Sequence, residues 1–368
     1  MSSASDRRAI PEVREDLRDV VPYGAPQLDV PVRLNTNETP LPPPPAFLAE
    51  LARRLATVEL NRYPDRDAVE LRGALADREG LDVAHVWAAN GSNEVLLQLL
   101  QAYGGPGRSA LTFRPGYAMH AGLCRTTGTE VVTVDLDASG GLDVAMVEGA
   151  VARTVDEHDP VVTMFANPNN PTGALVDLDT LRALHDVVRG LLVVDEAYIE
   201  FAPPGASARQ LLEELPRLVV TRTFSKAFRL AGLRLGYLLG PAQVVEDLLR
   251  VRLPYHLDAI TQLAGLVALE QEASFLDHRQ ATVEERERLA AAVSVLPGVE
   301  VLPSAANFVL LHTGRSDLLE RLLDHGILVR DVSSAFDRPG SWRITVGTPE
   351  ENDRLVTALT AVLAHPQP

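Results

Sequence analysis

The chain has 368 residues, of which 46% are hydrophobic and 23% are charged, and its formal net charge is −16. This length exceeds a typical single core, so we expect two domains. The acidic balance without a basic stripe excludes a nucleic-acid surface, and the single cysteine, Cys124, excludes an internal disulfide framework. No residue spacing is typical of a zinc site. Residues 1–12 are polar and lack an apolar h-region, so we expect a cytoplasmic protein without a membrane anchor.

The amino-terminal part is predicted to be an arm. We place the arm at residues 1–40 and expect it to pack with the small domain. The Pro-rich run at residues 40–45 then leads into a large domain at residues 41–250. A smaller carboxy-terminal α+β domain is expected at residues 251–368.

Between about residues 85 and 240, apolar runs alternate with amphipathic helices. This order predicts a mainly parallel sheet between helix layers, an α/β fold. Three strands are predicted in the small domain, at residues 307–312, 327–330 and 342–346. The charged run at residues 284–288 is predicted to be a solvated helix face.

The first polar motif of the large domain is Gly91-Ser92-Asn93-Glu94, where a strand ends and a helix begins. The free N–H groups and the dipole of a helix start favour a bound anion, so Ser92 and Asn93 are candidate phosphate ligands. We expect Glu94 to turn away and serve the helix start. Tyr117 follows the strand at residues 110–113 and could stack on a planar ring, although an aromatic residue there is more often core.

The next two motifs also follow strands. Residues 161–166 run into a turn that Pro168 and Pro171 stiffen, which could aim the Asn170 amide, although Asn-Pro repeats are common in ordinary turns. Residues 191–194 are apolar and predict a strand buried on both faces. Asp195 ends that strand at the edge where open α/β sheets bind ligands, although it could simply cap a helix.

The most informative segment is Ser225-Lys226, followed by Arg234, after an apolar run at residues 218–220. A lysine forms a Schiff base with a carbonyl cofactor if its surroundings favour the neutral amine, whereas a lone lysine is usually a solvated surface residue. Pyridoxal phosphate has such a carbonyl, and its phosphate would find donors in Ser225 and Arg234. Asp195 would pair with its ring nitrogen, and Tyr198 could donate to its phenolic oxygen together with Asn170.

Taken in order, these motifs resemble the fold-type I aminotransferases, and within them the histidinol-phosphate aminotransferase subfamily. The resemblance covers about residues 20–364. It rests on these segments: 21–26, 33–38, Asn61-Arg62-Tyr63-Pro64-Asp65, 91–94, 169–173, 195–198, 225–228, 232–234 and 342–348.

The resemblance implies a role for each matching residue. Lys226 would carry pyridoxal 5'-phosphate and move a proton at the substrate carbon, Asp195 would pair with the ring nitrogen, and Tyr117 would stack on the ring. The other implied cofactor contacts are Ser92, Asn93, Asn170, Tyr198, Ser225, Arg234 and, from a second subunit, Tyr63. The implied substrate contacts are Tyr23, Asn37, Arg330 and the carboxylate-binding Arg343. A homodimer with shared sites follows from Tyr63.

The implied reaction is transamination of L-histidinol phosphate with 2-oxoglutarate, giving imidazole acetol phosphate and glutamate in histidine biosynthesis. Two alternatives keep the cofactor: an aromatic amino acid aminotransferase and a phosphoamino-acid decarboxylase. A third, the non-catalytic module of a regulator, lacks an appended basic DNA-reading segment. Thr39 departs from the asparagine common in the subfamily, and Gly-Ser-Asn stands where Gly-Ala-Asp or Gly-Ser-Asp is also seen, so both positions could tune specificity.

Overall fold

The fold is described by a computed structural model for residues 10–18, 20, 22 and 24–364. The strands within these residues are β1 (Val32–Arg33), β2 (Val86–Ala89), β3 (Ser109–Arg114), β4 (Glu130–Asp135), β5 (Val162–Ala166), β6 (Leu191–Asp195), β7 (Leu218–Thr223), β8 (Gly236–Leu239), β9 (Glu300–Leu302), β10 (Phe308–His312), β11 (Ile327–Leu328), β12 (Arg330–Asp331) and β13 (Ser341–Thr345).

The α-helices are α1 (Pro45–Leu55), α2 (Val69–Glu79), α3 (Ser92–Tyr103), α4 (Ala118–Thr127), α5 (Val144–Met146), α6 (Ala152–His158), α7 (Leu178–Val187), α8 (Ala242–Val251), α9 (Ala259–Glu270), α10 (Glu272–Leu276), α11 (Arg279–Ser294), α12 (Leu318–Asp324), α13 (Ser333–Phe336) and α14 (Pro349–Leu363). The 3₁₀ helices are η2 (Glu15–Leu17), η3 (Val83–His85), η5 (Ile199–Phe201), η6 (Ala208–Leu211) and η7 (Ala231–Leu233), and η4 (Val147–Val151) is a π-helix.

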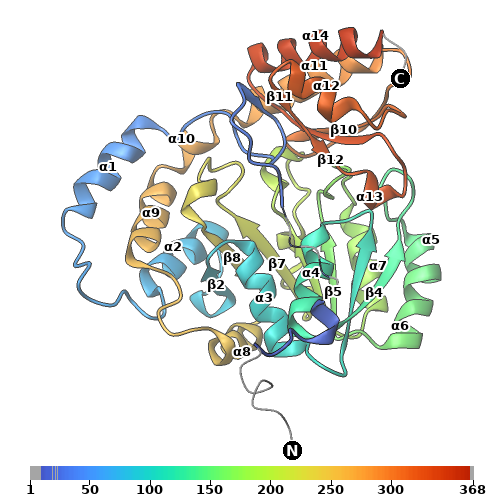
Figure 1. The fold of residues 1–368 in the computed structure, drawn as a ribbon. Helices are drawn as coiled ribbons and strands as arrows, with labels where there is room; N and C mark the ends of the chain where they lie inside the picture. Colours follow the sequence, from blue (N-terminus) through green and yellow to red (C-terminus); the bar gives the residue numbers. More distant parts are fainter. Residues whose placement is uncertain (1–9, 19, 21, 23, 365–368) are drawn as a thin grey trace, which may run out of the picture.

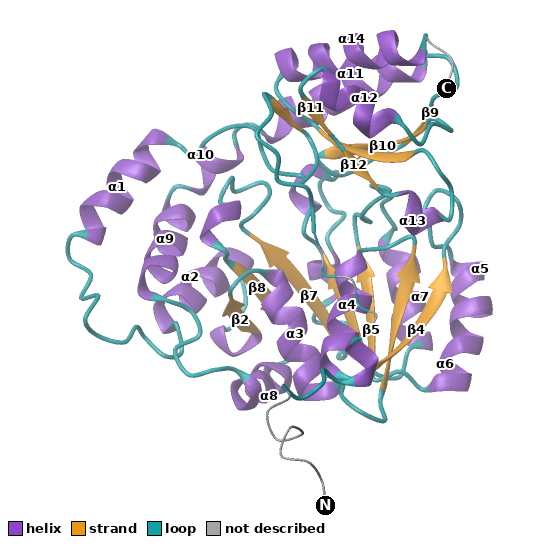
Figure 2. Cartoon of the chain, in the orientation of Figure 1, coloured by secondary structure: helices purple, strands orange, loops and turns teal. Residues whose placement is uncertain are grey.

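The large domain is built on a seven-stranded sheet in the order β2-β8-β7-β6-β5-β3-β4. Strand β8 is antiparallel to both of its neighbours, and the other pairs are parallel. The predicted α/β fold with a mainly parallel sheet is therefore confirmed. The carboxyl ends of β5 and β7 point towards the lobe that carries α11, α12 and α14 (Figures 1 and 2).

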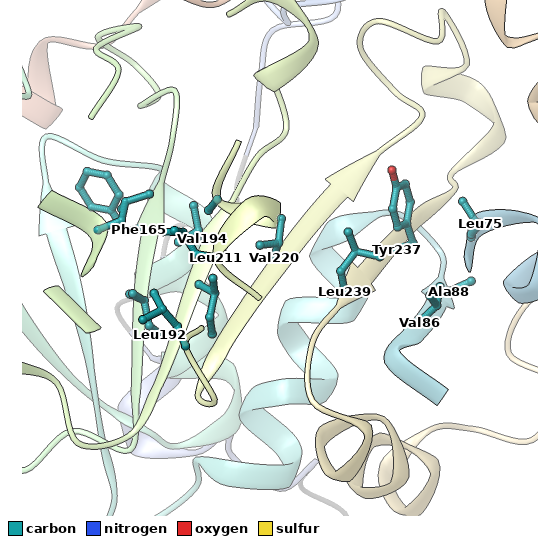
Figure 3. Packing of buried hydrophobic residues seen from close by; sticks show 14 of the residues in the cluster. Leu75, Val86, Ala88, Phe165, Leu192, Val194, Leu211, Val220, Tyr237 and Leu239 are labelled. Carbon is teal, nitrogen blue, oxygen red and sulfur yellow. The ribbon is translucent and has the colours of Figure 1, made fainter. Parts of the chain in front are cut away.

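Side chains of the central strands alternate between two apolar cores. In β6, Leu192 and Val194 face the core that also contains side chains of α2 and α7, whereas Val193 faces the core beneath α3, α4 and α8. Figure 3 shows the first of these cores, with Leu192, Val194 and Val220 side by side on neighbouring strands. Strands that bury both faces read as continuous apolar runs, which is why the sequence predicts them well.

The small domain contains the antiparallel sheet β12-β13-β10-β9. Helices α11, α12 and α14 pack on it, and Trp342 is fully buried there. Thr348 and Glu351 form a capping box at the start of α14, with Pro349 in its first turn, and these features fix where the helix begins. Strand β1 of the arm pairs in parallel with β11, so the arm is joined to this domain.

Three details of the small-domain region differ from the expectations. The single strand expected at residues 327–330 is two strands, since β11 pairs with the arm whereas β12 pairs with β13. Within the charged run, Arg286 is buried and donates to the Ala306 carbonyl, so this position is not solvated. Helix α9, expected in the small domain, packs on α1 and α2, and we therefore propose a boundary near Asp277.

Candidate active site

One cavity, of about 150 Å³, opens at the carboxyl ends of the large-domain strands and is closed from above by the arm and β13. It brings together most of the predicted site residues, which come from segments far apart in the chain. Its lining includes Asn37, Ser92, Asn93, Tyr117, Asn170, Asp195, Tyr198, Ser225, Lys226, Arg234 and Arg343.

Lys226 lies in this cavity just after β7. Its Nζ donates to the Thr36 carbonyl at 2.9 Å and lies 5.7 Å from the centre of the Tyr198 ring. Burial, reinforced by the positive charge of Arg343, lowers the pKa of the Lys226 amine from 10.5 to about 7. A neutral amine, which is the nucleophilic form, is therefore accessible near neutral pH.

Phosphate donors gather at one end of the cavity, around the start of α3. The first N–H groups of this helix lack intrahelical partners, and Arg234 Nη1 donates to Ser225 Oγ at 3.2 Å beside them. Glycine is required at two positions here: Gly91 has φ +81°, which residues with a side chain rarely adopt, and a Cβ on Gly236 would lie 2.3 Å from the Ser92 backbone nitrogen.

The two neighbouring side chains of α3 behave differently. Glu94 accepts from the Asn90 backbone and side chain, both at 2.6 Å, and so it turns back to the helix start as expected. Asn93 Oδ1 accepts from the Tyr117 hydroxyl at 3.1 Å, which holds the Tyr117 ring beside the cavity.

The Asp195 carboxylate ends β6 at the floor of the cavity and is 3% exposed. Thr221 of β7 donates to its Oδ1 at 3.1 Å, and His120 Nε2 lies 3.5 Å from its Oδ2. His120 Nε2 is buried and finds no hydrogen-bond partner among the described residues. A buried acid that accepts one hydrogen bond from Thr221 and lies beside His120 has the character expected of a partner for a protonated ring nitrogen.

A chain of hydrogen bonds crosses the cavity from the arm to the small domain. Tyr198 Oη accepts from Asn37 Nδ2 at 2.9 Å and from Asn170 Nδ2 at 3.2 Å. Asn170 Oδ1 in turn accepts from Arg343 Nη1 at 2.7 Å. Arg343 Nη2 also donates to the Asn35 carbonyl at 2.8 Å, so the arginine of β13 is aimed into the site.

Among the described residues, two of the predicted site residues, Tyr63 and Arg330, do not line this cavity. Tyr63 is 78% exposed and stacks on Tyr255, with ring centroids 4.3 Å apart. Arg330 pairs across the strands with Arg343 and donates to the Gly24 carbonyl at 3.0 Å. Tyr23 lies outside the described residues.

Sequence reasoning missed two contributors to this site. His120 lies in the first turn of α4, three residues after the N-cap Tyr117, and its ring contacts the Tyr117 ring edge to face with centroids 5.4 Å apart, so its nearness to Tyr117 in the sequence was the available signal. The Thr36 carbonyl, which accepts from Lys226, has no sequence signal because any residue supplies a backbone oxygen.

The site's donor set fits pyridoxal 5'-phosphate. A phosphate cradle that a Cβ would fill lies at one end, a buried carboxylate lies on the floor, and a lysine of lowered pKa lies between them. Among the described residues, no group of three or more His, Cys, Asp or Glu side chains could hold a metal ion. No helix in the same residues is long and apolar enough to cross a membrane.

The fold and the site together define a fold-type I pyridoxal-phosphate-dependent aminotransferase. Residues 30–359 match the profile of the aminotransferase class I and II family, and the chain belongs to that family. It is 48% identical to the histidinol-phosphate aminotransferase of Thermobifida fusca over 347 residues, which cover 92% of each chain.

Solved structures agree with this assignment. The histidinol-phosphate aminotransferase of Sinorhizobium meliloti, in complex with pyridoxal-5'-phosphate, superposes with a TM-score of 0.86 at 26% identity, covering 97% of this chain and 99% of that one. The L-threonine-O-3-phosphate decarboxylase of Porphyromonas gingivalis gives a TM-score of 0.79 at 25% identity, covering 91% and 100% respectively. One scaffold thus carries two reactions.

Proposed function

We propose that the protein transfers the amino group of L-histidinol phosphate to 2-oxoglutarate, yielding imidazole acetol phosphate and glutamate in histidine biosynthesis. The observation that carries the chemistry is the buried Lys226 amine in one cavity with Asp195 and a phosphate cradle. The 48% identity to a histidinol-phosphate aminotransferase over 92% of both chains supports the substrate.

When bound, pyridoxal 5'-phosphate supplies an electron sink for the negative charge that develops at the substrate carbon. Lys226 Nζ would take up and return the proton at the carbon that bears the amino group. Asp195 would hold a proton on the ring nitrogen, while Tyr198 and Asn170 would hydrogen-bond the phenolic oxygen. Ser92, Ser225 and Arg234 would hold the phosphate by hydrogen bonds and charge.

Substrate selection is proposed for the small-domain sheet. Arg330 and Arg343 are direct partners on β12 and β13, and cross-strand partners share a face of the sheet. Arg343 would bind the carboxylate of glutamate, whereas Arg330, with Tyr23 and Asn37, would serve the phosphorylated substrate. Two positive charges on one face favour substrates with an anionic group.

We further propose that the active unit is a cytoplasmic homodimer. Tyr63 stacks on Tyr255 yet is 78% exposed and does not line the cavity of its own chain, so a second copy could contact its exposed face. Closed two-fold dimers are the commonest assembly among soluble homo-oligomers.

Product identification distinguishes the proposed reaction from its alternatives. Protein loaded with pyridoxal 5'-phosphate is incubated with L-histidinol phosphate and 2-oxoglutarate, and both products are quantified by mass spectrometry. We expect imidazole acetol phosphate and glutamate in equal amounts. Turnover confined to phenylalanine would favour the aromatic aminotransferase, and carbon dioxide released from O-phospho-L-threonine would favour the decarboxylase.

A further inference from the structure

The loop that carries Lys226, residues 224–230 between β7 and η7, is called the Lys226 loop. It is held by contacts of the Lys226 backbone as well as of the Lys226 amine. The Lys226 carbonyl accepts from the Arg229 backbone N–H at 3.0 Å and from Thr39 Oγ1 at 2.8 Å. Arg229 has φ +55°, a left-handed conformation that residues with a side chain rarely adopt. Such a conformation persists only when surrounding contacts maintain it.

Contacts of the Arg229 side chain provide that support. The side chain is 8% exposed, and its guanidinium pairs with the Asp277 carboxylate. Nε and Nη2 lie 3.1 and 2.7 Å from His278 Nδ1. Burial and the charge of Arg229 lower the pKa of His278 to about 4, so the imidazole is neutral near neutral pH. Its Nδ1 also lies 2.9 Å from the Phe275 carbonyl, so this nitrogen accepts from the guanidinium in one tautomer and donates to Phe275 in the other.

Asp277 and His278 lie where the chain passes from the large domain to the small one. Phe275 of α10 is fully buried in the large-domain core and contacts the Phe228 ring, with centroids 5.9 Å apart. Helix α11, which begins at Arg279, packs on α14, β9 and β10 of the small domain. Thr39 lies where the chain passes from the arm into the large domain, between β1 and α1. Both segments that connect the large domain to the rest of the chain therefore contact the Lys226 loop.

We propose that Arg229 is a positioning residue. Its contacts with Asp277 and His278 hold the Lys226 loop against the segment that joins the two domains, so that the position of the Lys226 amine depends on the position of the small domain. This inference rests on the proposed function, because it requires Lys226 to react with the cofactor aldehyde. Arg229 acts through Lys226 and is not itself expected to touch cofactor or substrate.

Two substitutions break the link from opposite ends. Arg229→Gly removes the guanidinium but suits the left-handed backbone, so it separates the ion pair from backbone strain. Asp277→Asn keeps Arg229 and removes the charge of a carboxylate that is 65% exposed. Asp353→Asn is a matched control, because Asp353 of α14 is also 65% exposed and pairs with an arginine, Arg288 of α11, away from Lys226.

The first measurement is the rate at which the cofactor-free protein reacts with pyridoxal 5'-phosphate, monitored by absorbance. The second is the affinity for pyridoxine 5'-phosphate, which has no aldehyde. We expect Arg229→Gly and Asp277→Asn to slow the reaction at Lys226 by about three- to tenfold, as for the loss of one interaction, with pyridoxine 5'-phosphate affinity unchanged. Asp353→Asn should react like the parent protein.

Parent-like reaction rates in both variants would overturn the inference. A parallel loss of reaction rate, pyridoxine 5'-phosphate affinity and thermal stability would also overturn it, because the role of Arg229 would then be structural only. If the parent protein itself does not react at Lys226, the proposed function fails together with the inference, and that result is distinct from a defect confined to the variants.

Discussion

The Lys226 amine lies in the cavity and has a lowered pKa. Its pKa of about 7 lies below the ordinary 10.5, because burial and the charge of Arg343 disfavour the ammonium form. Between these two values the unfolded chain holds more protons at this residue than the folded one. The stability of the cofactor-free protein should therefore fall as the pH drops through this window.

The same shift predicts the pH dependence of cofactor capture. The rate constant for reaction of the cofactor-free protein with pyridoxal 5'-phosphate should rise with pH and level off above about 7, where the amine is neutral. Stopped-flow absorbance measures this rate, and Lys226→Ala, which should neither react nor turn over, is the control. A midpoint near 10 would show that the amine is solvated.

Asp195 tests the assignment of the ring-nitrogen partner. Asp195→Asn preserves the shape and removes the charge, so the loss should fall on proton transfer rather than on cofactor binding. A charge-assisted hydrogen bond contributes about 1.5–3 kcal/mol, which corresponds to at least a roughly tenfold lower single-turnover rate. Unchanged single-turnover kinetics would mean that Asp195 only supports the fold.

At the scale of elements, the strand ends of the large domain could be predicted from the sequence. Strands such as β6 are buried on both faces and are apolar runs in the sequence, and the polar residues that line the cavity stand at the end of such a run, as Asp195 does, or a few residues beyond it. Ser92 and Lys226 follow the same rule. A polar side chain that follows a recognised apolar strand therefore predicts a residue of the site.

Other features could not be predicted because they depend on contacts between distant segments. Strands β11 and β12 are separated in the sequence only by Val329, and only the pairing of β11 with the arm divides them. Helix α9 is largely apolar, and the sequence does not show that it packs on α1 and α2 rather than in the small domain. Likewise, the left-handed backbone of Arg229 has no sequence signal, since arginine rarely adopts it.

The pairing of β12 with β13 leads to a prediction about substrate choice. Arg330→Ala should weaken binding of L-histidinol phosphate at least about tenfold and that of glutamate little, because a phosphate dianion loses a charged donor whereas glutamate keeps Arg343. Dissociation constants from absorbance titration measure both effects. Arg321→Ala in α12 is the control, and equal losses for the two substrates would assign Arg330 to shared binding or to folding.

At the scale of the whole molecule, Tyr63 predicts sites shared between two subunits. Lys226→Ala and Tyr63→Ala proteins, each impaired alone, are mixed and allowed to exchange subunits. A mixed dimer would have one site with both lesions and one with neither, so activity should recover towards one intact site per dimer. No recovery after demonstrated exchange, or an active species that sediments as a monomer, would place Tyr63 in its own subunit's fold.

The central claim, amino transfer from a phosphorylated substrate, is tested most directly by a half-reaction titration. The absorbance of protein loaded with pyridoxal 5'-phosphate is followed while L-histidinol phosphate, glutamate or phenylalanine is added. L-histidinol phosphate and glutamate should each convert the bound cofactor to its amine form, phenylalanine should require much higher concentrations, and 2-oxoglutarate should reverse the change. No conversion by L-histidinol phosphate, or a lower half-saturating concentration of phenylalanine, would contradict the claim.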